Sequence, residues 1–204
     1  MSASLAERSK TSVVAAEERL RANLYMLLAG LLGRAPNADV LSATNQIIGD
    51  ESELGQALGT LARVAGRAKV EAVAQEYQDL FIGLGRGELV PFGSYYLTGF
   101  LNEKPLAVLR SDMARLGIER PSHVKEPEDH IAALLDMMAG LITGEFGEPA
   151  PLEEQKRFFK QHVEPWAGYF FRDLEAAKAS ILYAALGSVG RIFMQIETQA
   201  FEMD

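Results

Sequence analysis

Cysteine does not occur among the 204 residues of this chain. Without thiols the protein cannot form a disulfide, a thiolate metal site or a cysteine nucleophile. Histidine is scarce as well, with only His123, His130 and His162. A zinc or iron site would need these histidines together with carboxylates. No HExxH motif is present and no second histidine stands at helical spacing, so we expect neither a metal nor a cofactor.

Motifs of nucleophilic catalysis and phosphate binding are also lacking. No serine lies in a G-x-S-x-G elbow, and the neighbours Asp129 and His130 would point about 100° apart on a helix, which argues against a triad. The run from Gly83 to Gly87 lacks the Lys-Ser/Thr of a Walker A loop and follows no predicted strand, so we interpret it as a connection. We expect that the chain is not an enzyme. The alternative, a small nucleotide-binding switch or metalloenzyme, is tested by GTP turnover and metal analysis.

Long apolar runs and an excess of positive charge are missing too. The most apolar run, residues 24–32, is about half the roughly 20 residues that cross a bilayer. Residues 1–20 contain three glutamates and no apolar core of a secretory signal, so we expect neither export by that route nor stable membrane insertion. Lys and Arg total 20 against 28 Asp and Glu, which gives a net charge of −8 and an isoelectric point near 5.0. Such an acidic chain is not expected to bind nucleic acid.

The composition that remains is that of a globular protein. Apolar residues make up 48% of the chain and the mean hydropathy is 0.00, which suits a single domain over residues 1–204 with a sizeable core. Apolar residues at three- and four-residue steps predict a helix over 13–32, and no sustained period-two alternation predicts a sheet. We expect an all-α, bundle-like fold of about eight to ten helices. The further helices are predicted at 39–48 (opening at Asp39 or Ser42), 52–64, 68–84, 104–116, 128–142, 152–178 and 180–201.

One face of the helix at 68–84 is the first candidate for function. Tyr77, Leu80, Phe81 and Leu84 stand at i, i+3, i+4 and i+7, the spacing of a single helix face. This face leads directly into the glycine-rich segment 83–93. For Leu80 we favour an ordinary core position.

A second candidate is the segment Pro91-Phe92-Gly93-Ser94-Tyr95-Tyr96. Proline and glycine at this density disfavour a regular helix, so a loop with three aromatic rings is predicted. Loops run over the surface, and aromatic rings in them are either tucked inward or offered to a partner.

The third candidate is the acidic segment Glu126-Pro127-Glu128-Asp129-His130. Pro127 suits the first turn of a helix, and the carboxylates would lie near its positive end. A histidine cation is disfavoured at that end, whereas a neutral imidazole is compatible with it. A capping or interface role for His130 is therefore the simplest interpretation.

At these residues the sequence resembles the TorD/DmsD/NarJ group of redox-enzyme maturation chaperones. The resemblance rests on four motifs in order, which span residues 77–166. They are Tyr77-x-x-Leu80-Phe81, Pro91-x-x-Ser94-x-Tyr96, Glu126-Pro127-x-Asp129-His130-Ile131 followed by Met137-Met138, and Phe159-x-x-His162-x-x-Pro165-Trp166.

The resemblance implies an all-helical cytoplasmic chaperone whose partner is a molybdenum-cofactor oxidoreductase. The chaperone would bind the twin-arginine signal peptide of that catalytic subunit until the cofactor is loaded. A NarJ-type adaptor for a non-exported subunit, such as nitrate reductase or formate dehydrogenase, is the alternative. Aromatic residues stand at Tyr77, Phe92 and Tyr96, where tryptophan is often found in TorD and DmsD. The implied peptide-binding positions are Tyr77, Leu80, Phe81, Pro91, Phe92, Tyr96, Asp129 and His130, with Glu126 in a supporting role.

The chemistry of the residues agrees with this implication. A twin-arginine signal combines cations with an apolar stretch, so its receptor needs carboxylates beside an apolar groove. Arginine pairs well with carboxylate, and Asp129, helped by Glu126 or Glu128, is the candidate partner. The protein is expected to be a monomer or, by exchange of halves about a hinge at 118–127, a domain-swapped homodimer.

Overall fold

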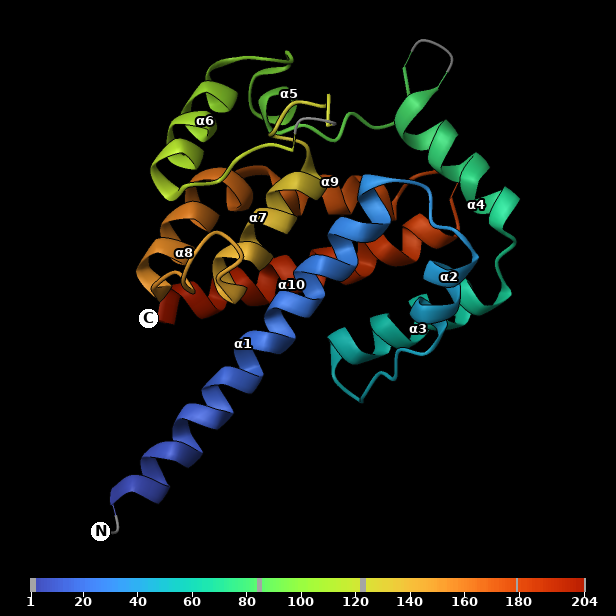
Figure 1. Cartoon of the computed structure of the whole chain (residues 1–204). Helices are drawn as coiled ribbons and strands as arrows, with labels where there is room; N and C mark the ends of the chain where they lie inside the picture. Colours follow the sequence, from blue (N-terminus) through green and yellow to red (C-terminus); the bar gives the residue numbers. More distant parts are fainter. Residues whose placement is uncertain (1–2, 84–85, 122–123, 179, 204) are drawn as a thin grey trace.

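The described residues of the computed structural model form an all-helical fold (Figure 1). The structure describes residues 3–83, 86–121, 124–178 and 180–203, with side chains from residue 16 onward. No strand occurs among them, and one isolated bridge joins Phe92 to His130, so the predicted fold class is confirmed. The elements are α1 (Ala3–Gly33), α2 (Ala38–Asn45), α3 (Glu53–Arg67), α4 (Val70–Tyr77), η1 (Gln78–Ile82), α5 (Gly93–Thr98), α6 (Lys104–Leu116), α7 (Ile131–Thr143), α8 (Leu152–Phe158), η2 (Phe159–Val163), α9 (Glu164–Glu175) and α10 (Leu182–Met203).

Helix ends follow the local capping signals in several places. The Ser52 side chain accepts the Gly55 N–H at the start of α3, as predicted. Helix α6 has Pro105 in its first turn and is closed by Gly117, both as predicted, and Gly117 adopts a left-handed conformation. The predicted openings of α2 were wrong: Asn37 is the cap and its side chain accepts the Val40 N–H, which places Asp39 in the first turn.

Three predicted boundaries need correction. Helix α1 begins at Ala3 rather than at residue 13. Helix α7 begins at Ile131, so the acidic segment precedes the helix instead of forming its first turn. The aromatic segment is not a loop throughout, because α5 begins at Gly93 and carries Tyr95 and Tyr96.

Two long helices change pitch through π-helical turns, η1 and η2. Helix α4 passes into η1 and stops at Gly83, whose φ is +61°; Leu84 lies outside the described residues. Before α9, the irregularity predicted near Pro165 is the π-helix η2. Proline lacks an N–H and its ring clashes with the preceding turn, so a wider turn accommodates it.

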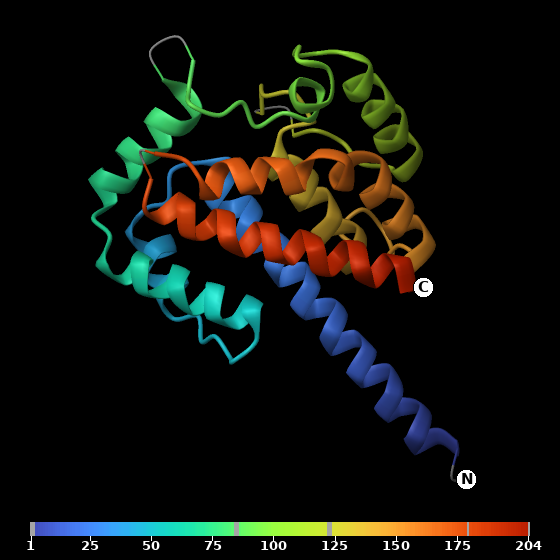
Figure 2. The same cartoon turned by 180° about the vertical axis from the view of Figure 1, so that it is seen from behind.

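The hydrophobic core lies where α1, α7, α9 and α10 pack together. Helix α1 packs mainly against α7, and α10 lies along α9, as Figures 1 and 2 show. The largest fully buried side chains include Trp166, Tyr25 and Tyr183. Among the described residues, no helix combines the length and apolarity that a membrane span requires.

The peripheral elements flank this core at opposite ends. Helices α2 and α3 lie on one side with α4, and α5 and α6 lie at the other end beside α8 and α9 (Figure 1). The segment that precedes α5 connects the two ends. The proposed hinge at 118–127 is described only in part, because residues 122–123, which include His123, lie outside the described residues. The single-domain arrangement stays a prediction.

Candidate peptide-binding site

Backbone pairing brings together two of the three candidate clusters. The N–H of Ile131 donates to the carbonyl of Pro91, and the N–H of Gly93 donates to the carbonyl of Asp129, both at 2.9 Å. Residues 91–93 and 129–131 therefore run antiparallel as one short pair, which we call the paired segments. Two motifs that are far apart in the sequence become one structural unit.

Asp129 holds this unit to helix α5. Its side chain is 3% exposed, and its Oδ2 accepts the Ser94 N–H at 2.7 Å in the first turn of α5. A carboxylate at this end of a helix is favoured by the unpaired N–H groups there. The other oxygen, Oδ1, is buried without a hydrogen-bond partner, and so is the neighbouring Ser94 hydroxyl.

His130 caps helix α7 in the neutral form. Its Nδ1 accepts the Ala132 N–H at 3.1 Å, which requires a lone pair on that nitrogen. Burial lowers the pKa of His130 to about 4, although the negative charges of Glu126 and Asp129 act to raise it. The capping interpretation of His130 is confirmed. The ring also packs edge-on against Phe92, with centroids 5.0 Å apart.

Tyr77 and Phe81 form an aromatic cluster with Tyr183 of α10. Centroid distances are 5.0 Å between Tyr77 and Phe81 and 5.5 Å between Phe81 and Tyr183. Tyr77 and Phe81 are half-buried, whereas Tyr183 is fully buried. Leu80 is fully buried in the core, as favoured from the sequence. Tyr183 was missed by sequence reasoning, because nothing in α10 distinguishes it from other core aromatics.

Glu126 is a charged residue of the acidic segment whose effect reaches both aromatic groups. It is exposed, and its charge raises the pKa of Tyr77, in addition to the larger effect of burial. The same charge favours the protonated form of His130. The negative charge of Glu126 therefore acts on one ring of each aromatic group.

The side chain of Tyr96 packs on helix α9. Its ring packs against Trp166 and Phe170 of α9 at 5.3 and 6.0 Å, and its hydroxyl donates to Asp173 Oδ2 at 3.1 Å. Pro91 is buried. The structure thus brings Phe92, Asp129 and His130 together in the paired segments. Tyr77 and Phe81 lie in a separate cluster with Tyr183, and the ring of Tyr96 packs on α9.

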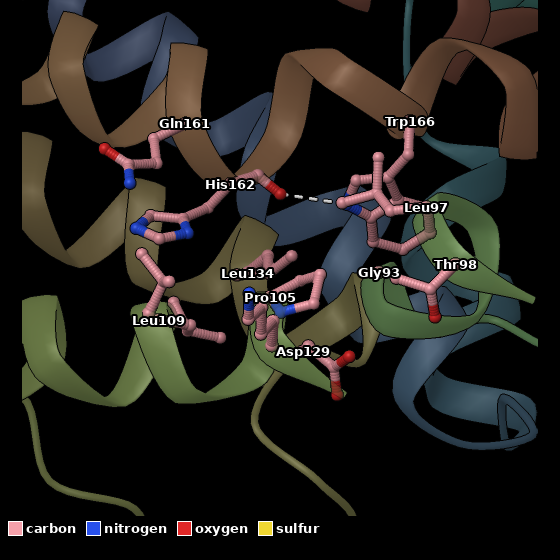
Figure 3. Close-up of a pocket in the computed structure, with 12 residues that line it drawn as sticks. Gly93, Leu97, Thr98, Pro105, Leu109, Asp129, Leu134, Gln161, His162 and Trp166 are labelled. Carbon is pink, nitrogen blue, oxygen red and sulfur yellow. Dashed lines mark hydrogen bonds between the residues drawn. The ribbon is translucent and has the colours of Figure 1, made fainter. Parts of the chain in front are cut away.

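A cavity of about 390 Å³ lies on the α5–α6 side of the paired segments. Figure 3 shows Trp166 and Leu97 on one side of it, His162 and Gln161 on the other, and Asp129 near Pro105. The indole N–H of Trp166 is occupied, since it donates to the His162 carbonyl at 2.8 Å. His162 in turn contacts Asp112 of α6 through Nε2 at 2.9 Å. The lining is mainly apolar, and Asp129 is among its few polar residues.

The site has the character of a binding surface. Across the described ranges, no group of three or more His, Asp or Glu side chains is arranged to hold a metal ion. An apolar cavity with few polar groups is the usual form of a ligand-binding site.

Known proteins define the family. A family model described as nitrate reductase delta subunit matches residues 49–172, more than half of the chain. Chaperone protein TorD of Vibrio atlanticus is 26% identical over 200 residues, covering 88% of this chain and 93% of that protein. Chaperone protein TorD of Vibrio cholerae is 27% identical over 195 residues, covering 86% and 89%. A crystal structure from Archaeoglobus fulgidus, described as a redox enzyme maturation protein, shares the fold with a TM-score of 0.57 at 21% identity, covering 86% and 93%.

These similarities identify the class of protein and then its family. The class is that of the molybdoenzyme maturation chaperones, and the protein is not an enzyme. The chain belongs to the nitrate reductase delta subunit family. The resemblance to the TorD/DmsD/NarJ group stated from the sequence is confirmed.

Proposed function

We propose that this chaperone acts in the cytoplasm, where it binds an arginine-bearing N-terminal segment of a molybdenum-cofactor oxidoreductase and holds it until the cofactor is inserted. A twin-arginine signal peptide is the first candidate for that segment. An arginine of the bound segment enters the cavity beside Asp129. Phe92, His130 and the Tyr77 cluster contribute further contacts on the other side of the paired segments. Glu126 supplies a negative charge at the rim of that second surface.

The observation that carries this proposal is the unpaired Oδ1 of Asp129. A buried carboxylate oxygen without a partner is costly, and native proteins rarely keep one without a reason. A guanidinium offers five N–H donors in a planar fork, which suits a carboxylate in an apolar cavity. Lys104 also lines the cavity. Its side chain is exposed, so its positive charge is screened by the solvent and its ions.

The substitution Asp129→Asn tests this assignment. Asparagine retains an oxygen for the Ser94 N–H and removes the charge. Because hydrogen bonds to charged groups contribute about 1.5–3 kcal/mol, affinity for a synthetic twin-arginine signal peptide should fall roughly tenfold to a hundredfold. The matched control is Asp39→Asn, which removes an exposed carboxylate on α2. Equal affinity of wild type and Asp129→Asn in calorimetry contradicts the proposal.

A non-exported client is the second candidate, and the match to the nitrate reductase delta subunit model favours it. The bound segment would then belong to a catalytic subunit of the nitrate reductase or formate dehydrogenase type. Pull-down with such a subunit, with and without its N-terminal segment, distinguishes the two clients. If the chaperone retains the catalytic subunit equally well with and without its N-terminal segment, both the exported and the non-exported version of the proposal are contradicted.

A further inference from the structure

Four large apolar side chains are exposed within a short stretch at the α5–α6 end of the molecule. They belong to α5, the following turn and α6, and we call them the α5–α6 face: Leu97 at 43%, Phe100 at 69%, Leu101 at 46% and Val108 at 41% exposure. A single exposed apolar side chain needs no explanation, but such a group marks an interaction surface.

Two residues of the α5–α6 face also line the cavity that Asp129 lines. Leu97 and Val108 are both exposed to solvent and part of the cavity lining, so they form its apolar rim. Trp166 lies deeper in the same cavity and is 1% exposed. A bound peptide with a cationic side chain at Asp129 would therefore leave the cavity across these apolar side chains.

Two left-handed residues and two side-chain hydrogen bonds define the turn between α5 and α6. Gly99 and Asn102 have left-handed φ values of +82° and +60°, and both residue types tolerate them. The Thr98 hydroxyl donates to the Ser94 carbonyl at 2.7 Å and accepts the Phe100 N–H at 3.2 Å. Phe100 and Leu101 are thus presented from a hydrogen-bonded turn, and such local bonds reduce the entropy cost of binding.

We propose that the α5–α6 face binds the apolar stretch of the client segment whose arginine enters the cavity. This inference rests on the proposed function and adds the surface for the apolar part of the ligand. Charge favours this occupant over a second copy of the chain, because two copies of net charge −8 repel each other whereas a cationic peptide is attracted.

Calorimetry with two peptides tests the inference. One peptide carries an arginine pair followed by a leucine-rich run, and the other has the run replaced by serine and asparagine. The double variant Phe100→Ser/Leu101→Ser changes only exposed side chains, so the fold is retained, which circular dichroism verifies. The matched control is Ile48→Ser, which removes a 94% exposed apolar residue that follows α2.

The double variant should bind the apolar peptide about tenfold more weakly than wild type, because two apolar contacts are lost. Its affinity for the polar peptide should be unchanged, and Ile48→Ser should match wild type with both peptides. If wild type binds the apolar peptide and the double variant binds it equally well, the inference is wrong while the proposed function stands.

Failure of wild type to bind either peptide refutes the proposed function itself. A dimer seen by light scattering that the double substitution abolishes, with no change in peptide affinity, assigns the face to a second copy of the chain and overturns the inference.

Discussion

At the scale of single residues, His130 couples the candidate site to the stability of α7. Its pKa of about 4 in the folded state lies below the usual value of 6.5. Between these values the unfolded chain binds more protons than the folded one, so stability is fully present above about pH 6.5 and falls as the pH is lowered toward 4.

The variant His130→Asn separates capping from titration, because asparagine is a good N-cap and does not ionise in this range. We expect a shallower loss of stability in urea unfolding at pH values from about 7 to about 4. His162, whose pKa is also lowered mainly by burial, contributes a residual slope that both proteins share. Identical pH profiles for variant and wild type would exclude the neutral cap.

Glu197 is the buried charge that ties α1 to α10. It is 1% exposed, accepts from Arg21 Nε and Nη2 at 2.9 and 2.7 Å, and accepts from the Tyr25 hydroxyl at 2.8 Å. Glu197→Gln leaves the Arg21 charge without its buried partner, so we expect a loss of about 3–5 kcal/mol in unfolding free energy. Glu18→Gln, which removes the more exposed partner of Arg21, should cost at most about 1 kcal/mol. Comparable losses for the two variants would contradict this account.

At the scale of elements, glycines set the close approach of α10 to α9. A Cβ on Gly187 would lie 2.4 Å from the Glu175 backbone nitrogen, and backbone cannot move aside cheaply. Gly187→Ala should therefore destabilise the protein by about 1–3 kcal/mol in thermal or urea unfolding. Gly168→Ala, at a helical position in α9 with open space around the added Cβ, should be stabilising by about 0.5–1 kcal/mol. If both variants shift stability in the same direction, helix separation is not the cause.

The element scale also explains which parts of the fold are predictable from the sequence. Ser52 and Gly117 each cap a helix next to them in the sequence, so the local sequence was enough to predict where α3 begins and α6 ends. Helix α5 was missed because the carboxylate at its first turn belongs to Asp129, 35 residues away from Ser94. A cap supplied by a distant segment leaves no trace in the local pattern.

The candidate site was predictable from the sequence only in part. The sequence motifs singled out the residues of the paired segments and two rings of the Tyr77 cluster, and three aromatic residues in five positions of a predicted loop were the clearest local signal. They did not show that Tyr96 turns toward Trp166, or that the exposed residues after it flank a cavity. Side-chain direction there depends on how α5 packs against α9, which is a tertiary property.

At the scale of the whole molecule, the net charge of −8 shapes the encounter with a cationic client. Long-range attraction speeds association and is screened by salt, with a Debye length of about 10 Å at 0.1 M. In stopped-flow fluorescence, the association rate for an arginine-bearing peptide should fall as salt is added, while the dissociation rate changes much less. A salt-independent association rate would show that charge does not guide the encounter.

The most direct test of the central claim is a double-mutant cycle between Asp129 and the client arginine. Affinities are measured by calorimetry for wild type and Asp129→Asn, each with a signal peptide that carries arginine or glutamine at the paired position. The account predicts a coupling free energy of about 1.5–3 kcal/mol. Additive losses, with a coupling near zero, would show that the arginine binds elsewhere.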